Sequence, residues 1–240
     1  MLPPQFDLER YYSAGYFQGG AVDGYADYAG SESSLRAEFR QTLAHILRLA
    51  PRRGALLEFG CAYGYFLEEA ARHFDSTLGI ELSAEAVAIA RARGLNVQAG
   101  VVDDALAGPF DAVVGLDVIE HVPEPAETVA HLSRVMAPNG VLVLTTGDWG
   151  SPLARVMGPR WRLMTPPQHV SFFTPKAMQA LLNRAGLVVV EISRPWKRVP
   201  LALFAYQAQR ILGLRPRVLR IPGALRMNLF DAMRVTARKP

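Results

Sequence analysis

The sequence predicts a doubly wound α/β fold, in which a mostly parallel sheet carries helices on both faces. Short apolar runs that suit buried parallel strands alternate along the chain with stretches of helical periodicity. An apolar run, a loop with two glycines and a helical pattern follow one another over residues 55–72, as in a strand, a tight turn and a helix. The 240 residues, 50% of them hydrophobic, suffice for one such domain with a sizeable core.

An arm and a helix precede the first strand. In residues 1–34, an arm or lid, tyrosines and phenylalanines are spaced by glycines, and these rings either pack on the domain or contact a ligand. Ser33 or Ser34 is placed to cap a helix over residues 35–47, where apolar residues recur at spacings of three and four. The α/β domain itself is predicted over residues 35–240.

Seven strands and the helices between them are predicted in order. A strand is assigned where a short apolar run lies between turn residues, and a helix where capping residues precede helical periodicity. The strands span residues 55–59, 77–82, 96–100, 110–117, 141–146, 187–192 and 229–237, and the later helices span residues 65–72, 84–93, 125–136 and 175–185. Two insertions interrupt this alternation: a loop-rich segment at 147–174 on the substrate side, and a basic segment at 195–226 with a helix at 198–214.

The loop after the first predicted strand has the features of a ligand site. Gly60 and Gly64 remove side chains on both sides of Cys61 and Ala62, so a ligand can approach the N–H groups that open the next helix. Ligands of open α/β sheets bind at this carboxyl edge. Glu58 stands directly before the loop, and its negative charge favours a cationic ligand over a pyrophosphate. The dinucleotide fingerprint G-x-G-x-x-G is not matched here.

A second acid fits a nucleoside ligand. Glu81 ends the second predicted strand, roughly 20 residues after Glu58, a spacing that suits a carboxylate accepting hydrogen bonds from both hydroxyls of a ribose. Nucleoside cofactors of several classes share this geometry. The sequence therefore predicts adenosine binding at this edge without fixing the reaction.

The stretch from Glu58 to Gly64 resembles motif I of the class I S-adenosylmethionine-dependent methyltransferases, acid-x-Gly-x-Gly-x-Gly, with Ala62 in place of the middle glycine. Glu81, Asp117 in the segment LDVIEHVPEP, and the Pro-Asn-Gly turn at residues 138–140 match further motifs in the family's order. The resemblance implies a Rossmann-like seven-stranded sheet of order 3-2-1-4-5-7-6 with the last strand antiparallel.

Two segments, DVIEHVPEP and PPQHVSFFTPKAMQALLNRAGLVVVEI, resemble in particular the branch with the ubiquinone-biosynthesis O-methyltransferases and bacterial small-molecule methyltransferases. The resemblance implies S-adenosylmethionine as cofactor, with Glu58 and Asp117 around its cationic end. Asp103 is expected to accept a hydrogen bond from the adenine amine, with Asp104 as the alternative. The full set of expected cofactor residues is Glu58, Gly60, Cys61, Ala62, Gly64, Glu81, Leu82, Asp103 and Asp117.

Two histidines lie where they can reach a methyl acceptor. His121 follows the fourth predicted strand and His169 lies in the 147–174 insertion, and either is a candidate base for a hydroxyl that loses its proton. The structural alternative is that His121 braces the Pro123 turn and that His169 anchors its own loop.

Asp117, Glu120 and His121 also form a D-x-x-E-H cluster that can hold a divalent cation such as Mg²⁺. The ubiquinone-biosynthesis O-methyltransferases, which this segment resembles, use a metal with acidic and histidine residues at these positions. A bound metal would acidify and orient a hydroxyl. Without a metal, Glu120 would only pair with a nearby base.

The composition limits the classes of partner and the compartment that we expect for this protein. The single cysteine argues against a disulfide framework and suits a cytoplasmic protein. The first residues do not have the pattern of a signal peptide. No apolar run is long enough to span a membrane. The excess of Lys and Arg after residue 194 either forms a solvated face or rests on an anionic membrane as a peripheral contact. No nucleic-acid-binding module is recognisable, so no nucleic acid partner is expected.

These observations predict a methyltransferase for a small-molecule hydroxyl, carried by a sugar, a quinone precursor or a natural-product intermediate. Two alternatives remain: an enzyme for a lipid-linked acceptor at the membrane surface, and a non-catalytic cofactor-binding scaffold of the same fold.

Overall fold

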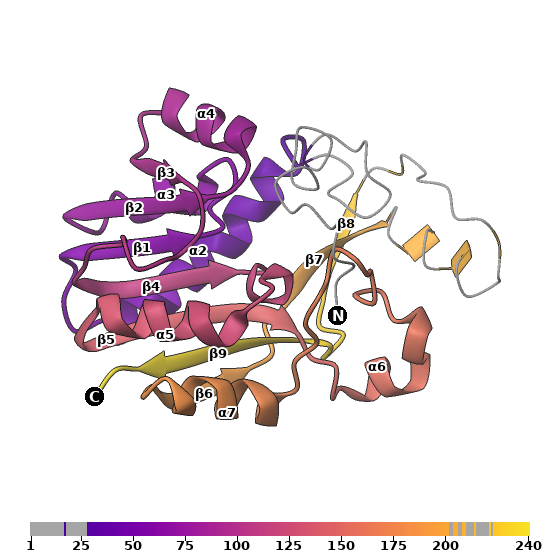
Figure 1. The fold of residues 1–240 in the computed structure, drawn as a ribbon. Helices are drawn as coiled ribbons and strands as arrows, with labels where there is room; N and C mark the ends of the chain where they lie inside the picture. Colours follow the sequence, from indigo (N-terminus) through magenta and orange to yellow (C-terminus); the bar gives the residue numbers. More distant parts are fainter. Residues whose placement is uncertain are drawn as a thin grey trace.

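A seven-stranded sheet forms the centre of the computed structural model, which describes Phe17 and residues 28–201, 204–205, 208–209, 214, 221 and 223–240 (Figure 1). The strands lie in the order β3-β2-β1-β4-β5-β9-β6. The pairs from β3 across to β5 are parallel, and β9 is antiparallel to both of its neighbours. Because β9 is the seventh strand of this sheet in chain order, the predicted order 3-2-1-4-5-7-6 is confirmed.

The bounds of the elements follow the predicted alternation closely. Across the sheet the strands are β3 (Val97–Ala99), β2 (Ser76–Glu81), β1 (Ala55–Phe59), β4 (Phe110–Leu116), β5 (Met136–Gly147), β9 (Ala232–Arg238) and β6 (Val188–Ser193). The helices are α2 (Glu32–Leu49), α3 (Tyr65–Ala70), α4 (Ala84–Ala92), α5 (Pro125–Val135), α6 (Pro152–Met157) and α7 (Pro175–Arg184), with short 3-10 turns η1 (Ile119–His121) and η2 (Gly158–Arg160). A separate hairpin consists of β7 (Lys197–Pro200) and β8 (Ala224–Met227).

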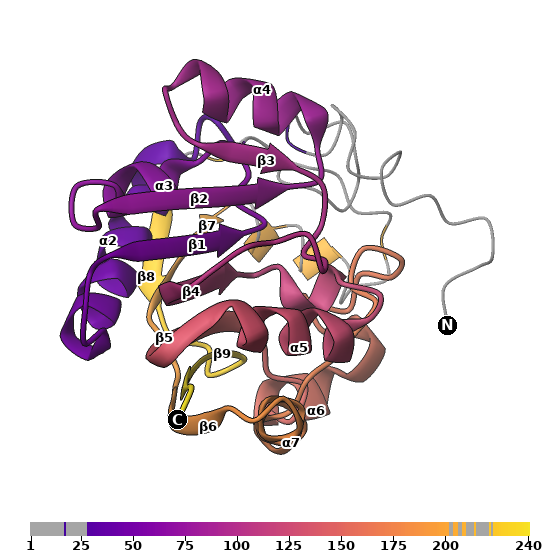
Figure 2. The ribbon, with the colours of Figure 1, turned by 60° about the vertical axis from the view of Figure 1, so that its left-hand side comes forward.

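Side chains of the central strands contribute to a hydrophobic cluster on each face of the sheet. Leu57 of β1 and Val113 of β4 belong to a buried cluster with side chains of α5 and α7. Their neighbours Leu56 and Ala112 belong to a second cluster with side chains of α2, α3 and α4. Successive side chains of a strand point to opposite faces, so strands that are apolar throughout need helices on both sides. Figures 1 and 2 show the helices distributed in this way around the sheet.

The basic insertion begins with a strand, so the prediction of a helix from residue 198 is wrong at its start. Residues 197–200 form β7 and pair antiparallel with β8. Pro200 explains the difference, because proline is unfavourable inside a helix and its ring pushes the preceding residue into an extended conformation. Most of the remaining predicted helix and insertion lies outside the described residues. The hairpin stands beyond the carboxyl ends of β1 and β4 (Figure 1).

Smaller differences occur at element ends. Helix α2 begins at Glu32, ahead of the predicted caps Ser33 and Ser34, and α6 lies within the insertion predicted as loop. The last strand begins at Ala232, later than predicted, because Phe230 adopts a left-handed φ of 55° that an extended strand excludes. Most of the 1–34 arm lies outside the described residues. Among the described residues, no helix combines the length and the apolar character that a membrane crossing needs.

Candidate active site

The loop between β1 and α3 has a left-handed backbone at three positions. Gly60, Ala62 and Gly64 have φ values of 70°, 47° and 76°. A Cβ atom on Gly60 would lie 2.5 Å from Cγ2 of Val118, and one on Gly64 would lie 2.3 Å from Cδ1 of Leu95. Both glycines are therefore required by backbone conformation and by packing. Ala62 occupies the same conformation with a side chain, which is unfavourable for an L-residue.

A cavity of about 200 Å³ opens beside this loop at the carboxyl edge of the sheet. Its walls come from the ends of β1, β2 and β4, from the segment after β3, and from α2. Eight residues predicted for cofactor or acceptor chemistry line it: Glu58, Gly60, Cys61, Ala62, Glu81, Leu82, Asp117 and His121. Gly64, Asp103 and His169 are not part of the lining.

Glu81 joins the end of β2 to the loop. Its Oε2 accepts a hydrogen bond from the backbone N–H of Ala62 at 2.9 Å, and its Oε1 accepts one from the N–H of Ser83 at 2.8 Å. Burial raises the pKa of Glu81 even though both bonds favour the ionised form. Each carboxylate oxygen has a second lone pair, so the side chain keeps the capacity to accept from ribose hydroxyls.

Glu58 is a buried acid that has no cation paired with it in the part of the chain that the structure describes. Burial, reinforced by the charge of Glu81, raises the pKa of Glu58 well above its ordinary value. Its Oε2 has no hydrogen-bond partner among the residues that the structure describes. A cationic ligand in the cavity would stabilise the ionised form of this carboxyl group.

Asp117 follows β4 and is held by a residue that the sequence did not single out. Nζ of Lys197, on β7, donates to Oδ2 of Asp117 at 2.6 Å, and Oγ1 of Thr145 donates to Oδ1 at 3.0 Å. Burial alone would raise the pKa of Asp117, but Lys197 and then Thr145 hold it below its ordinary value. Lys197 is 80 residues away in sequence. Recognising this pair requires knowing that the hairpin folds back over the sheet edge.

His121 and His169 meet beside the cavity, with ring centroids 4.7 Å apart. Nδ1 of His121 is 2.9 Å from the backbone oxygen of Gln168, and Nδ1 of His169 is 2.7 Å from that of Leu163. A carbonyl oxygen can only accept, so Nδ1 of each ring is the donor in these two contacts. Burial lowers the pKa of both rings, which favours neutral imidazoles.

Glu120 completes this group. Its backbone oxygen accepts hydrogen bonds from the N–H groups of Val170 and Ser171, at 2.9 and 3.1 Å, and so holds the His169 segment against η1. Burial, followed by the charge of Asp117, raises the pKa of the Glu120 carboxyl group to about 7. Ligand atoms of Glu120, His121 and His169 lie within 4.8 Å of one another, a group typical of metal sites. Asp117, predicted to share this group, is instead engaged by Lys197.

Aromatic rings of the 147–174 insertion extend from this group. Phe172 lies 6.4 Å from His169 and 6.0 Å from Trp149, between ring centroids, and Trp149 lies 5.6 Å from Trp161. Nε1 of Trp161 donates to Asp231 at 3.0 Å, which anchors the insertion to the start of β9. The insertion thus places an aromatic wall beside the two histidines.

Asp103 and Asp104, the two residues expected at the adenine, do not line the cavity. Asp103 is exposed, and its Oδ1 accepts from the N–H of Ala105 at 2.9 Å, while Asp104 pairs with Arg134 on α5. The cavity wall at this end consists of Gly100, Val101 and Val102. The role of Asp103 at the adenine stays a prediction.

The described part of the aromatic arm both packs and lines the cavity. Phe17 and Tyr28 belong to the cavity wall, and their ring centroids lie 5.1 Å from that of Tyr63 in the loop after β1. The N–H of Tyr28 donates to the backbone oxygen of Phe17 at 3.3 Å. Phe17 and Tyr28 therefore both pack on the domain and line the cavity, the two roles that the sequence left open for the rings of the arm.

Comparison with known proteins agrees with this geometry. Residues 32–192 match the family model of the methyltransferase domain. The chain is 31% identical over 192 residues to a ubiquinone biosynthesis O-methyltransferase of Xanthomonas axonopodis pv. citri (strain 306), covering 71% of this chain and 80% of the relative. It is 29% identical over 196 residues to the enzyme of that name from Xylella fastidiosa (strain 9a5c), covering 73% and 80%.

A solved structure supports the fold. Magnesium protoporphyrin IX methyltransferase from Synechocystis PCC 6803, with bound SAH, superposes with a TM-score of 0.60 at 14% identity, covering 91% of this chain and 90% of that one. At this identity the likeness shows the fold alone. With the sheet order, the cavity at the β1 loop and the family match taken together, the chain belongs to the methyltransferase domain family and is a class I S-adenosylmethionine-dependent methyltransferase.

Proposed function

We propose that the enzyme methylates a hydroxyl oxygen of a small molecule. The observation that carries this proposal is the pair of imidazole rings of His121 and His169, whose centroids lie 4.7 Å apart, with His121 in the wall of the cofactor cavity. A hydroxyl must lose its proton when it is methylated, and a neutral imidazole is suited to take it. The names of the curated relatives, O-methyltransferases of ubiquinone biosynthesis, support the same acceptor atom.

The reaction forms an O–C bond and breaks the bond between the methyl carbon and the sulfonium sulfur, which keeps the electron pair. The hydroxyl proton passes to Nε2 of His121 or His169. With S-adenosylmethionine bound, Glu58 and Asp117 would stabilise its cationic end, and Glu81 would hold its ribose. Alignment of acceptor and cofactor supplies much of the acceleration, and proton removal adds about 10²- to 10⁴-fold.

The aromatic wall favours a planar, apolar acceptor over a sugar. Phe172 and Trp149 lie on the side of His169 and offer faces for stacking. Close to the hairpin, Trp196, Leu225 and Phe230 are exposed large hydrophobic side chains. These side chains favour, as a second form of the proposal, a phenolic acceptor with a lipid tail that is delivered from a membrane surface.

The test uses S-adenosylmethionine with a labelled methyl group and paired acceptors. Each pair consists of a phenol, a sugar or a lipid-linked phenol in vesicles and the same compound with the hydroxyl replaced by hydrogen. Label is expected only on the hydroxyl member of a phenolic pair. Transfer to the hydroxyl-free partner, or to nitrogen in an amine analogue but not to oxygen, would contradict O-methylation.

Variants of the two histidines test the base at saturating cofactor. We expect kcat to fall by about 10²- to 10⁴-fold for His121→Ala or His169→Ala, whichever residue takes the proton. His73→Ala, at an exposed position, is the control and should match the unchanged enzyme. Equal kcat in all three variants would exclude a histidine base.

A further inference from the structure

Acidic side chains dominate the charge of the cavity beside the β1 loop. Glu38, Glu58, Glu81 and Asp117 belong to its wall, and none of the described residues in that wall is a lysine or an arginine. S-adenosylmethionine carries positive charge on its sulfonium and on its α-amino group, and negative charge on its α-carboxylate. The acids suit both cationic groups. The α-carboxylate needs a cation or hydrogen-bond donors, because a charge without a partner is costly away from water.

The backbone of the β1 loop is a poor partner for that carboxylate. The N–H groups of Gly60 and Cys61 both donate to the backbone oxygen of Ile80, at 2.8 and 3.2 Å. The N–H of Ala62 donates to the side chain of Glu81 at 2.9 Å. A carboxylate at these atoms would have to replace hydrogen bonds that the protein already makes, which lowers its net gain.

Lys197 brings an ammonium group to the wall of the cavity. Its Nζ lies 2.6 Å from Oδ2 of Asp117, which is a lining residue. The charge of Glu38, a lining residue on α2, also acts on Lys197, and β7 contacts α2. The lysine side chain is only 25% exposed, so it is partly shielded from water. A cation therefore stands beside the acidic wall at the end of β4.

We infer that Lys197 binds the α-carboxylate of the cofactor, so that the hairpin β7–β8 supplies a cofactor-binding residue. The inference rests on the placement of the cofactor in this cavity and does not depend on the acceptor. An ammonium group has three N–H donors, and the contact with Asp117 needs one of them. Lys197 can therefore bridge the carboxylate of Asp117 and the carboxylate of the cofactor.

The order of the strands directs the amino-acid part of the cofactor toward this lysine. With the ribose at Glu81 after β2 and the base beside residues 100–102 after β3, the adenosine lies over the β3–β2 side of the sheet. The remaining part then extends over the ends of β1 and β4, toward Glu58 and Asp117. The hairpin that carries Lys197 stands beyond the carboxyl ends of these two strands (Figure 1).

Arg162 is a second cation whose charge reaches Asp117, but it already has an acid of its own. Its Nε lies 2.8 Å from Oδ2 of Asp231, and its Nη2 lies 3.0 Å from Oδ1 of the same residue. Two parallel hydrogen bonds of this kind fix the guanidinium group in place. Lys197 is therefore better suited than Arg162 to accept a second anionic partner.

Paired ligands test the inference by calorimetry. SAH is compared with its decarboxylated analogue, which keeps the adenosine, the sulfur and the amino group but lacks the α-carboxylate. The unchanged enzyme should bind SAH more tightly than the analogue. In Lys197→Met, the affinity for SAH should fall by about 10- to 100-fold, as expected when a hydrogen bond between charged groups is lost. The affinity for the analogue should not fall, so the preference for the carboxylate disappears.

Two further variants complete the test. Lys197→Arg should keep most of the preference for SAH, since a guanidinium group also donates to a carboxylate. Lys176→Met, at an exposed position on α7, is the control and should match the unchanged enzyme. Equal loss of affinity for both ligands in Lys197→Met would assign a purely structural role to the lysine and overturn the inference. Unchanged affinity for SAH in that variant would overturn it as well.

The outcomes separate this inference from the proposed function, because calorimetry with SAH involves neither an acceptor nor turnover. A selective loss of SAH affinity in Lys197→Met would support the role of the lysine even if no hydroxyl compound were methylated. Methylation of a phenol by Lys197→Met with an unchanged KM for S-adenosylmethionine would remove that role and leave O-methylation standing.

Discussion

At the scale of single residues, two buried acids, Glu58 and Glu81, line the cavity in which we propose that the cofactor binds. Glu58 has no cation among the described residues and Glu81 has only backbone donors, while Asp117 has its own lysine. Two acids with raised pKa values are costly for the unliganded protein, since burial penalises their ionised forms. Binding a cation offsets that cost. We therefore predict that the cavity binds the methylated, cationic cofactor more tightly than its neutral-sulfur product.

Glu58 should make cofactor affinity depend on pH. The pKa of Glu58 is raised, so between its ordinary value of 4.5 and the raised value the group is protonated in the free enzyme, and a cation must displace that proton. We expect the affinity for S-adenosylmethionine to fall as pH decreases through this range, by about tenfold per unit of pKa change on binding. SAH, without the sulfonium charge, should show a smaller dependence. Calorimetric titration at several pH values measures both.

The matched variants are Glu58→Gln and, at an exposed position, Glu124→Gln. Glu58→Gln should bind the sulfonium cofactor weakly at every pH, while Glu124→Gln should follow the unchanged enzyme. A pH dependence that persists in Glu58→Gln would assign it to another group.

At the scale of elements, the hairpin β7–β8 is tied to the sheet edge by one charged contact into the site. Lys197 on β7 binds Asp117 at the end of β4, and β7 also contacts α2, which supplies Leu35, Glu38 and Phe39 to the cavity wall. A two-stranded hairpin alone is marginally stable, so its position depends on such contacts. The insertion thereby couples the outer rim of the molecule to the acid after β4.

Replacing Lys197 by methionine should destabilise the fold in a pH-dependent manner. The pKa of Asp117 is lowered, so its contribution to stability is fully present above the ordinary value of 3.8 and is lost as pH falls through the lower value in the folded state. Both side chains are partly exposed, which limits the loss in Lys197→Met to about 1 kcal/mol near neutral pH. Urea unfolding between pH 3 and pH 7 measures the difference.

Lys176→Met, at an exposed position on α7, is the control and should leave the free energy of unfolding unchanged. A Lys197→Met deficit that stayed constant down to pH 3 would mean that the lost stability comes from packing of the lysine stem and not from its charge.

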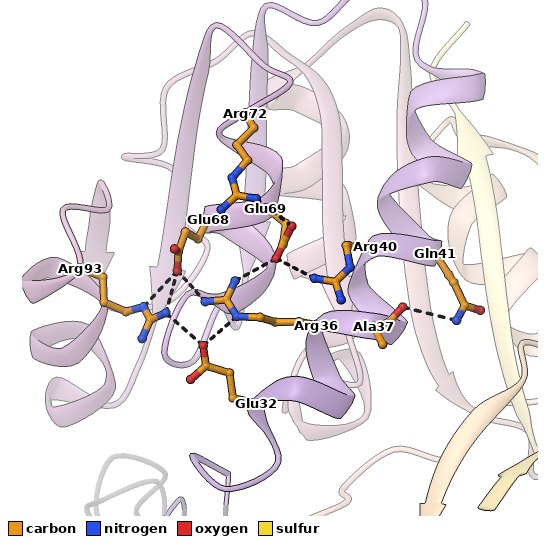
Figure 3. A network of polar contacts seen from close by, with 9 residues as sticks. All are labelled: Glu32, Arg36, Ala37, Arg40, Gln41, Glu68, Glu69, Arg72 and Arg93. Atoms are coloured by element: carbon orange, nitrogen blue, oxygen red, sulfur yellow. Dashed lines mark hydrogen bonds and ion pairs between the residues drawn. The ribbon is translucent and has the colours of Figure 1, made fainter.

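At the scale of the whole molecule, a network of ion pairs holds α2 against the core (Figure 3). The guanidinium group of Arg36 contacts Glu32, Glu68 and Glu69 at 2.7, 2.7 and 3.0 Å. Arg93, after α4, shares two of these acids, and Arg36 and Arg93 lie 5.1 and 5.0 Å from the ring centroid of Tyr65. Three helices are joined on one side of the sheet, and one of them forms a wall of the cofactor cavity.

Arg36→Met should therefore lower both stability and cofactor affinity. Loss of several charge-assisted hydrogen bonds from a half-buried arginine is expected to cost about 1 to 3 kcal/mol, and a loosened α2 should weaken cofactor binding several-fold. Thermal unfolding and calorimetry check the two effects. Arg40→Met removes a single ion pair with Glu69 from a more exposed side chain and should have a much smaller effect on both. Similar losses in both variants would contradict a special role for Arg36.

The sequence predicts the parts of the site that lie on single elements. Glu58, Gly60 and Glu81 stand at strand ends, and the carboxyl ends of parallel strands meet at one edge, so local pattern is enough to place them together. The Lys197–Asp117 pair and the approach of His169 to Glu120 depend on how two insertions fold back. No local periodicity encodes such contacts. The side chain of Asp103 accepts a hydrogen bond from the N–H of Ala105, and its role at the adenine stays a prediction.

The chain's one cysteine lies within the cofactor loop, and this has an experimental consequence. Cys61 lines the cavity but is buried, and burial strongly raises the pKa of its thiol, so the reactive thiolate is scarce while the loop is closed. Alkylation of the protein at a single atom then reports how often this loop opens. A bound nucleoside would shield the same sulfur, so protection from alkylation provides a label-free measure of cofactor occupancy that requires neither an acceptor nor turnover.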